Sequence, residues 1–151
     1  MRTLEATTAD RIADALRAVV GPASAARFHE SVAARAGVEI DRSGSWLLVR
    51  LANEGPMRLS DLAALQGVDV STTSRQVKPL LERGLVERAD HPTDGRSALL
   101  ALTEAGLSVH RRLSRERRAV IAAAVESWSP ADRDRFAALL ERFAGDFAER
   151  A

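Results

Sequence analysis

One stretch in the middle of the chain concentrates groups that can recognise nucleic acid. Residues 69–84 have helical spacing and contain hydroxyl, amide and cationic side chains, with no acidic residue between Val70 and Leu81. Such groups contact base edges and phosphates in the major groove of DNA, whereas a carboxylate facing phosphate would be repelled. A solvated helix face is the alternative interpretation. The residues expected to contact DNA are Ser71, Thr72, Thr73, Arg75, Gln76 and Lys78.

A second candidate contact follows a predicted tight turn. Residues 91–95 contain Asp-Gly after a proline, between two short runs that are typical of strands. Arg96 follows this turn, so its side chain can project beyond the hairpin toward a narrow minor groove, where the potential attracts arginine. Asp94 can pair with the guanidinium and orient it. An ordinary surface ion pair, worth about 0–1 kcal/mol, is the alternative.

Other chemistry has little support. The chain has no cysteine, which excludes disulfides, thiolate metal sites and thiol-based redox sensing. Its three histidines are far apart, and it shows neither a nucleophile–base constellation nor a glycine-rich phosphate loop. We therefore expect no metal, no cofactor and no enzyme activity. The net charge of +1, from 22 basic and 21 acidic residues, gives no argument for nucleic acid, because binding depends on where the charges lie.

The elements around residues 69–84 predict a helix-turn-helix. Ser60 is expected to cap a short helix that ends at Gly67, with Leu62, Ala63 and Leu65 facing inward. The second helix is predicted to begin at Asp69 or Ser71 and to end before Gly84. Two short helices joined by a turn that contains glycine have the sequence form of this motif. The inward residues expected on the second helix are Val70, Thr73 or Ser74, Val77, Leu80 and Leu81.

Short extended segments flank this motif, and longer helices lie beyond them. Strands are predicted at residues 57–59, 85–89 and 97–102, which makes a wing beside the helix-turn-helix. A first helix is predicted from residue 8 to residue 36, interrupted at Gly21-Pro22, and another from Asp41 or Ser43 to Asn53. A further helix is expected from Thr103 to about residue 127, and a last helix after a cap at Ser129.

The terminal helices carry apolar stripes. A stripe at Ile12, Leu16, Val19 and Val20 is predicted to be buried, and Phe28 and Val32 are expected to face inward. The last helix is so apolar on one side that it needs a partner, either within the chain or in a second copy, and we favour a dimer. The residues expected at the dimer interface are Ile12, Leu16, Phe136, Leu140, Phe143 and Phe147.

The region from Leu59 to Gly106 resembles the winged helix-turn-helix of the MarR (multiple antibiotic resistance regulator) family. The resemblance rests on residues 59–63, on residues 74–80 followed by Gly84-Leu85-Val86, on the wing signature Asp94-Gly95-Arg96-Ser97, and on residues 102–106. Each fragment alone is weakly specific, but all of them in this order are strongly specific. The cysteine-dependent peroxide sensors of this family are excluded, because this chain has no cysteine.

The resemblance implies a homodimer with two winged lobes, whose recognition helices enter successive major grooves of a pseudo-palindromic operator about 34 Å apart. It also implies repression that is relieved by a small ligand, and we expect an aromatic or anionic one. In this family Phe28, His29, Trp46 and Arg50 would border the ligand pocket, although such residues are more often plain core.

The sequence as a whole predicts a mainly α fold with a small β wing: a winged helix-turn-helix with N- and C-terminal dimerisation helices. We expect residues 1–151 to form a single unit, with residues 42–102 binding DNA and residues 8–36 and 103–149 forming the dimer. No apolar run reaches the ~18 residues that cross a bilayer, and no secretory signal is recognised, so a cytoplasmic transcriptional regulator is expected. A winged-helix module that binds protein without DNA remains the alternative.

Overall fold

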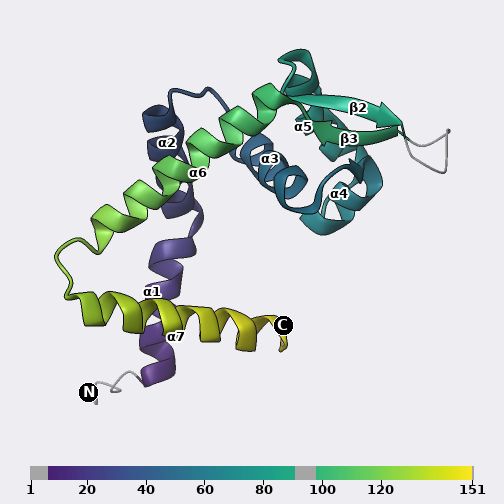
Figure 1. The fold of residues 1–151 in the computed structure, drawn as a ribbon. Helices are drawn as coiled ribbons and strands as arrows, with labels where there is room; N and C mark the ends of the chain where they lie inside the picture. The colour runs from purple at the N-terminus through teal and green to yellow at the C-terminus, as the bar shows by residue number, and fades with distance from the viewer. Residues whose placement is uncertain (1–6, 91–97, 151) are drawn as a thin grey trace. The chain divides into compact units, whose positions relative to one another are not determined.

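The computed structural model describes residues 7–90 and 98–150 (Figure 1). Its contacts divide the chain into two compact units, residues 1–116 and 117–151, where the sequence predicted a single unit. The elements are α1 (Thr8–Val20), α2 (Pro22–Ala36), α3 (Arg42–Glu54), β1 (Met57–Arg58), α4 (Leu59–Gln66), α5 (Val70–Glu82), β2 (Val86–Asp90), β3 (Ala98–Leu102), α6 (Glu104–Ala124) and α7 (Pro130–Ala148).

Local capping signals explain most of the helix boundaries. The first helical segment is interrupted at Gly21-Pro22, as predicted, and helix restarts at Pro22, because proline at a first helical position has no N–H that needs a partner. Asp69 caps α5 and Ser129 caps α7, each by accepting a backbone N–H of the first turn. The prediction for Ser60 was wrong: α4 begins at Leu59 with Arg58 at the cap position, so Ser60 lies inside the first turn.

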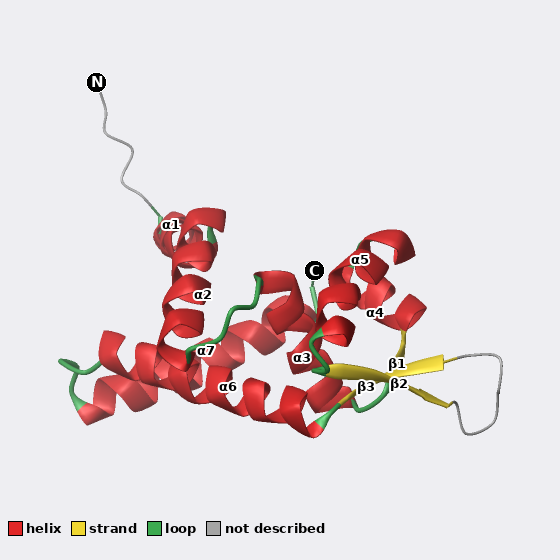
Figure 2. Cartoon of the chain, turned by 90° about the horizontal axis from the view of Figure 1, so that it is seen from above, coloured by secondary structure: helices red, strands yellow, loops and turns green. Residues whose placement is uncertain are grey.

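The three strands form one antiparallel sheet in the order β1-β3-β2 (Figure 2). Leu100, in the central strand, lies opposite Met57 of β1 and Arg88 of β2. Its side chain is buried together with Leu47 and Leu48 of α3 and Leu62 of α4. The predicted wing is therefore attached to the helix-turn-helix by a common apolar core.

The start of α6 packs against the turn that follows α5. The hydroxyl of Thr103 donates a hydrogen bond of 2.6 Å to the Gly84 carbonyl and accepts one of 3.0 Å from the Gly106 amide. The backbone of Gly106 approaches Leu85 so closely that a Cβ on residue 106 would lie 1.9 Å from the Leu85 carbonyl oxygen. This glycine is therefore required for the contact between α6 and the turn after α5. The helix ends at Ala124, before the predicted residue 127.

The loop between α2 and α3 is held by three side chains, one on α2, one on α6 and one directly after α5. Arg112 of α6 donates to the carbonyls of Ala36 and Gly37, and Arg83, after α5, donates to the Glu39 carbonyl. A ring nitrogen of His29 lies 2.8 Å from the carbonyl oxygen of Ile40. These contacts connect α2 and α6 to the end of α5 within the first unit.

Several apolar residues predicted to be buried are exposed in the single chain. Leu65 of α4 and Val70 of α5 are 52% and 48% exposed, because neither lies on the face of its helix that meets the core. The α1 stripe is likewise uncovered, with Ile12, Val19 and Val20 exposed and Leu16 half-buried. Val32 is buried as predicted, and Phe28 is half-buried.

The second unit contains the end of α6 and all of α7. Arg133 stabilises the turn between them by donating to the carbonyls of Glu126 and Trp128, at 2.7 Å and 3.0 Å. The rings of Trp128 and Phe136 meet edge to face with centroids 5.3 Å apart. No residue of α7 is buried in the single chain.

Among the helices in the described part of the chain, none has the length and apolar character needed to cross a membrane.

Candidate nucleic-acid interface

The recognition helix predicted from the sequence, α5, has one buried and one exposed face. Val77 and Leu80 are buried against the core of the first unit. Ser71, Arg75 and Lys78 are exposed, as is Ser74. The helix carries no acidic residue before Glu82. The exposed face of α5 therefore presents hydroxyl and cationic groups, and the carboxylates next to it lie at the two ends of the helix, at the N-cap Asp69 and at Glu82.

Thr73 does not belong to this exposed face. Its side chain is fully buried, with 0% relative exposure, and its hydroxyl lies 3.4 Å from the Asp69 carbonyl oxygen within the first turn. Of the two residues that could have faced inward, Thr73 does so and Ser74 is exposed. The prediction that Thr73 contacts DNA is therefore corrected, since its side chain is not accessible to a duplex.

The first turn of α5 contains a connected set of hydrogen bonds centred on Asp69. The carboxylate accepts the Thr72 amide at 2.7 Å, the Thr72 hydroxyl at 2.8 Å and the Ser71 hydroxyl. Nη2 of Arg75 donates to the Thr72 hydroxyl oxygen at 3.1 Å. The hydrogen bonds from Ser71 and then from Thr72 hold the pKa of Asp69 well below its usual range, so the carboxylate remains charged at neutral pH. The sequence identified Asp69 only as a possible helix start.

Gln76 and Lys78 are in different environments. The amide oxygen of Gln76 is buried and has no hydrogen-bond partner within the described residues, so in this conformation only its amide nitrogen is left to meet a duplex. Lys78 is exposed and lies 3.8 Å from Glu82, one helical turn away. An exposed pair of this kind contributes little to stability, which leaves the ammonium group available to phosphate.

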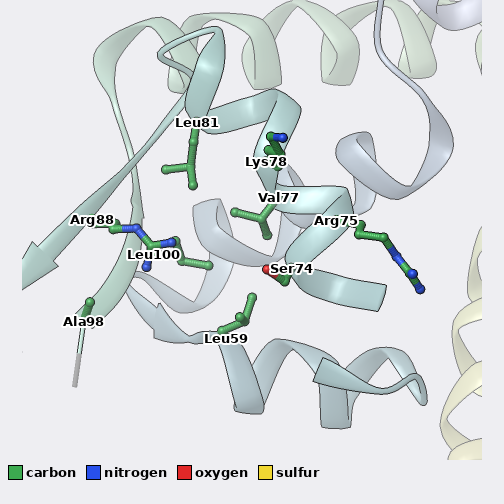
Figure 3. A pocket seen from close by; sticks show the side chains of 9 residues that line it. All are labelled: Leu59, Ser74, Arg75, Val77, Lys78, Leu81, Arg88, Ala98 and Leu100. Atoms are coloured by element: carbon green, nitrogen blue, oxygen red, sulfur yellow. The ribbon is translucent and has the colours of Figure 1, made fainter. Parts of the chain in front are cut away.

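A hollow of about 260 Å³ is lined by residues of α5 and of the sheet. Figure 3 shows Arg88 reaching from β2 across this hollow, whereas the guanidinium of Arg75 points away from it. Arg88 was not predicted from the sequence, although alternation along the strand places it on the same face as Val86, the face that meets α5. Arg88 adds a third cationic side chain beside Lys78 and Arg75. Asp94 and Arg96, predicted at the wing tip, lie outside the described residues.

The residues predicted to border a ligand pocket are only partly brought together. The guanidinium of Arg50 lies 5.3 Å from the ring centroid of Trp46 on α3, and Arg50 also pairs with Glu54 at 3.8 Å. On α2, His29 is held against the Ile40 carbonyl and Phe28 is half-buried. No group of three potential metal-ligating side chains occurs in residues 7–90 and 98–150.

The residues predicted at a dimer interface are accessible in the single chain. Ile12 of α1 is 46% exposed, and on α7 Phe136, Leu140 and Phe147 are 47%, 47% and 61% exposed. The rings of Phe143 and Phe147 stack with centroids 5.9 Å apart. Each helix therefore leaves an apolar face that its own unit does not cover.

Comparison with known proteins points to one family of regulators. A sequence model of the MarR family matches residues 46–98, which contain α4, α5 and β2. The HTH-type transcriptional regulator YxaD of Bacillus subtilis is 32% identical over 103 residues, which cover 68% of this chain and 72% of YxaD. The HTH-type transcriptional regulator MT0903.1 of Mycobacterium tuberculosis is 33% identical over 87 residues, 58% of this chain and 61% of that protein.

Solved structures agree with this match over almost the whole chain. RV1404 from Mycobacterium tuberculosis is 35% identical, with a TM-score of 0.77 over 94% of this chain and 95% of that one. A MarR family protein from Bacillus stearothermophilus shares the fold, with a TM-score of 0.82, 20% identity, and coverage of 93% and 96%. The PcaV regulator of Streptomyces coelicolor, solved with its natural ligand, is 26% identical, with a TM-score of 0.57 and coverage of 85% and 94%.

Proposed function

The chain belongs to the MarR family of transcriptional regulators, and on this premise we propose that it binds a pseudo-palindromic DNA operator as a homodimer and represses transcription until a small ligand releases it. The observation that carries the proposal is the exposed face of α5, where Ser71, Arg75 and Lys78 are accessible on the side opposite the buried Val77 and Leu80. This face carries side chains that can form hydrogen bonds with base edges in the major groove.

The contacts with DNA are divided among three regions of the winged lobe. Thr72, Gln76 and the exposed residues of α5 would meet base edges and nearby phosphates, and Arg88 at the sheet would add a phosphate contact. Arg96, oriented by Asp94, would enter the minor groove beside the wing. A cationic group near phosphate contributes binding that is independent of base sequence and weakens with salt, whereas base-edge contacts select the operator.

A homodimer is proposed because the terminal helices expose apolar faces that a second copy can cover. Exposed contiguous apolar surface is typical of interaction sites. The proposed interface uses residues of the N-terminal helices and of α7, among them Ile12, Leu16, Leu140 and Phe143. A two-fold dimer would present two recognition helices to the two half-sites of one operator.

The proposed ligand is small and aromatic or anionic. The Arg50 guanidinium over the Trp46 ring supplies a cation beside an aromatic surface, which suits such a molecule, and Phe28 and His29 would complete the pocket. The complex of PcaV with its natural ligand lends support by family likeness. A ligand releases DNA only if it prefers one spacing of the two lobes. We assign the protein no catalytic role and place it in the cytoplasm with its DNA.

The test is fluorescence anisotropy with the duplex that lies upstream of the protein's own gene, at several salt concentrations. We expect binding of the wild-type protein and a substantial loss with Arg75→Ala. Arg17→Ala is the matched control, since Arg17 is likewise exposed and donates to a residue three positions earlier, on α1. If the wild-type protein does not bind duplex DNA at low salt, the proposal is wrong, and the alternative of a winged helix that binds protein replaces it.

A further inference from the structure

The hydrogen-bond network at the start of α5 restricts how two of the exposed hydroxyls can bind. A hydroxyl group has one proton to donate and two lone pairs that accept. The carboxylate of Asp69 is charged and therefore can only accept, so the hydroxyls of Ser71 and Thr72 must direct their protons toward it. Neither hydroxyl then has a proton to offer to a ligand.

The lone pairs that each hydroxyl still has available to accept a hydrogen bond can be counted. Thr72 Oγ1 donates to Asp69 and accepts from Nη2 of Arg75, which leaves it one lone pair. Ser71 Oγ donates to Asp69 and retains two lone pairs. Ser71 is exposed and Thr72 half-buried, so these lone pairs border the surface that the proposed function assigns to DNA.

DNA offers few partners to a group that can only accept. Phosphate oxygens are acceptors, and so are guanine N7 and O6 and thymine O4 in the major groove. The major-groove donors are the exocyclic amino groups of adenine (N6) and cytosine (N4). A hydroxyl whose proton is committed elsewhere therefore gains nothing from phosphate, guanine or thymine oxygen, and selects adenine or cytosine.

We infer that Asp69 is a specificity-determining residue of the operator contact, because it orients the Ser71 and Thr72 hydroxyls as acceptors that select bases with a major-groove amino group. This inference rests on the proposed function, since it concerns the same surface of α5. Asp69 acts through its neighbours and is a positioning residue. Arg75 has the opposite polarity, because its guanidinium only donates, and the nitrogens not used by Thr72 suit guanine.

The test is selection of bound duplexes from a randomised pool, with the full-length wild-type protein and Asp69→Asn. Asparagine caps helices about as well as aspartate, so α5 is expected to remain folded. Its amide nitrogen, in place of Oδ2, would donate to Thr72 Oγ1 and free that hydroxyl proton for the duplex. We expect the base facing Thr72 to change from adenine or cytosine to guanine or thymine. Asp41→Asn is the matched control, because Asp41 caps α3 through Gly44 in the same way.

A second variant removes the hydroxyl without touching the cap. Thr72→Val keeps the branched shape and should abolish the preference at the facing base. A third measurement uses the duplex that the wild-type protein selects, with the amino group of the facing base removed: purine replaces adenine, or pyrimidin-2-one replaces cytosine. This change should weaken binding of the wild-type protein about tenfold. It should leave binding of Thr72→Val unchanged.

The outcomes distinguish failure of the inference about Asp69 from failure of the proposed DNA binding. A preference for guanine or thymine at these positions in the wild-type protein, or an unchanged preference in both Asp69→Asn and Thr72→Val, overturns the inference while DNA binding itself stands. If the wild-type protein selects no duplex at all, the proposed function fails, and the inference fails with it.

Discussion

Nη2 of Arg112 on α6 donates a hydrogen bond of 3.1 Å to the carbonyl oxygen of Gly37, the C-cap residue of α2. The same nitrogen also contacts the Ala36 carbonyl. A cation at the C-terminal end of a helix satisfies carbonyls that have no partner in the helix and interacts favourably with the helix dipole. This contact joins α2 to α6 across 75 residues of sequence.

Replacing Arg112 by methionine should therefore lower the free energy of unfolding. Methionine keeps the apolar stem but removes the donors, and hydrogen bonds from a charged group contribute about 1.5–3 kcal/mol. Denaturant unfolding measures the change. Arg111→Met, at the neighbouring exposed position, should stay within about 0.5 kcal/mol of wild type. Equal losses in the two variants would argue against the Gly37 contact.

Gly106→Ala should be strongly destabilising. The added methyl group would lie 1.9 Å from the Leu85 carbonyl oxygen and 3.2 Å from Cδ2 of Leu102, so α6 would have to move away from the turn after α5. We expect a loss of about 3 kcal/mol in thermal or denaturant unfolding. Gly145→Ala is the control, because a Cβ there meets nothing within 4 Å, and alanine in the interior of α7 should stabilise by about 0.5–1 kcal/mol.

Removal of the α5 cap should have a pH-dependent effect. Hydrogen bonds from Ser71 and Thr72 lower the pKa of Asp69 in the folded protein, so its stabilising contribution is present above the ordinary carboxyl pKa of about 3.9 and is lost as the pH falls below it. Asp69→Ala should lower the Tm at pH 7, and the difference from wild type should narrow below about pH 4. A difference that stays constant from pH 7 to pH 3 would contradict a role for the charged carboxylate.

Lys78→Ala should weaken binding to operator and unrelated duplexes alike. Loss of a phosphate contact reduces the slope of log K against log salt concentration by about 0.9 for each contact, whereas loss of a base contact leaves that slope unchanged. Anisotropy titrations at several salt concentrations measure it. Arg142→Ala is the control, because Arg142 is exposed on α7 and pairs with Asp146 at 3.7 Å, much as Lys78 pairs with Glu82. An unaltered slope for Lys78→Ala would exclude the phosphate contact.

Leu140→Glu should convert the proposed dimer to a monomer, because it places a charge in the proposed α7 interface. Light scattering coupled to size-exclusion chromatography reports the mass. Leu65→Glu makes the same substitution at a residue of similar exposure on α4, 52% against 47% for Leu140, and should leave the mass unchanged. If Leu140→Glu retains the wild-type mass, α7 does not form the interface.

The positions of the helices and strands were largely predictable from the sequence, because local signals govern where they begin and end. Caps at Asp69 and Ser129, a restart at Pro22 and alternation along the strands depend on residues close together in the chain, so the helices and strands were placed to within a few residues. The exposure of Arg75 and Lys78 likewise followed from helical period alone.

Only tertiary packing decided which borderline residues enter the core. Thr73 and Ser74 are both compatible with the inward face of α5, and it is the position of α5 against the rest of the first unit that buries Thr73. Leu65 and Val70 are apolar yet exposed, since their faces meet no other element of the unit. The requirement for glycine at position 106 is equally invisible in the sequence, because it arises from the backbone of Leu85, 21 residues away. Periodicity identifies which residues share a face of a helix or strand. Which other element packs against that face depends on contacts between residues distant in sequence.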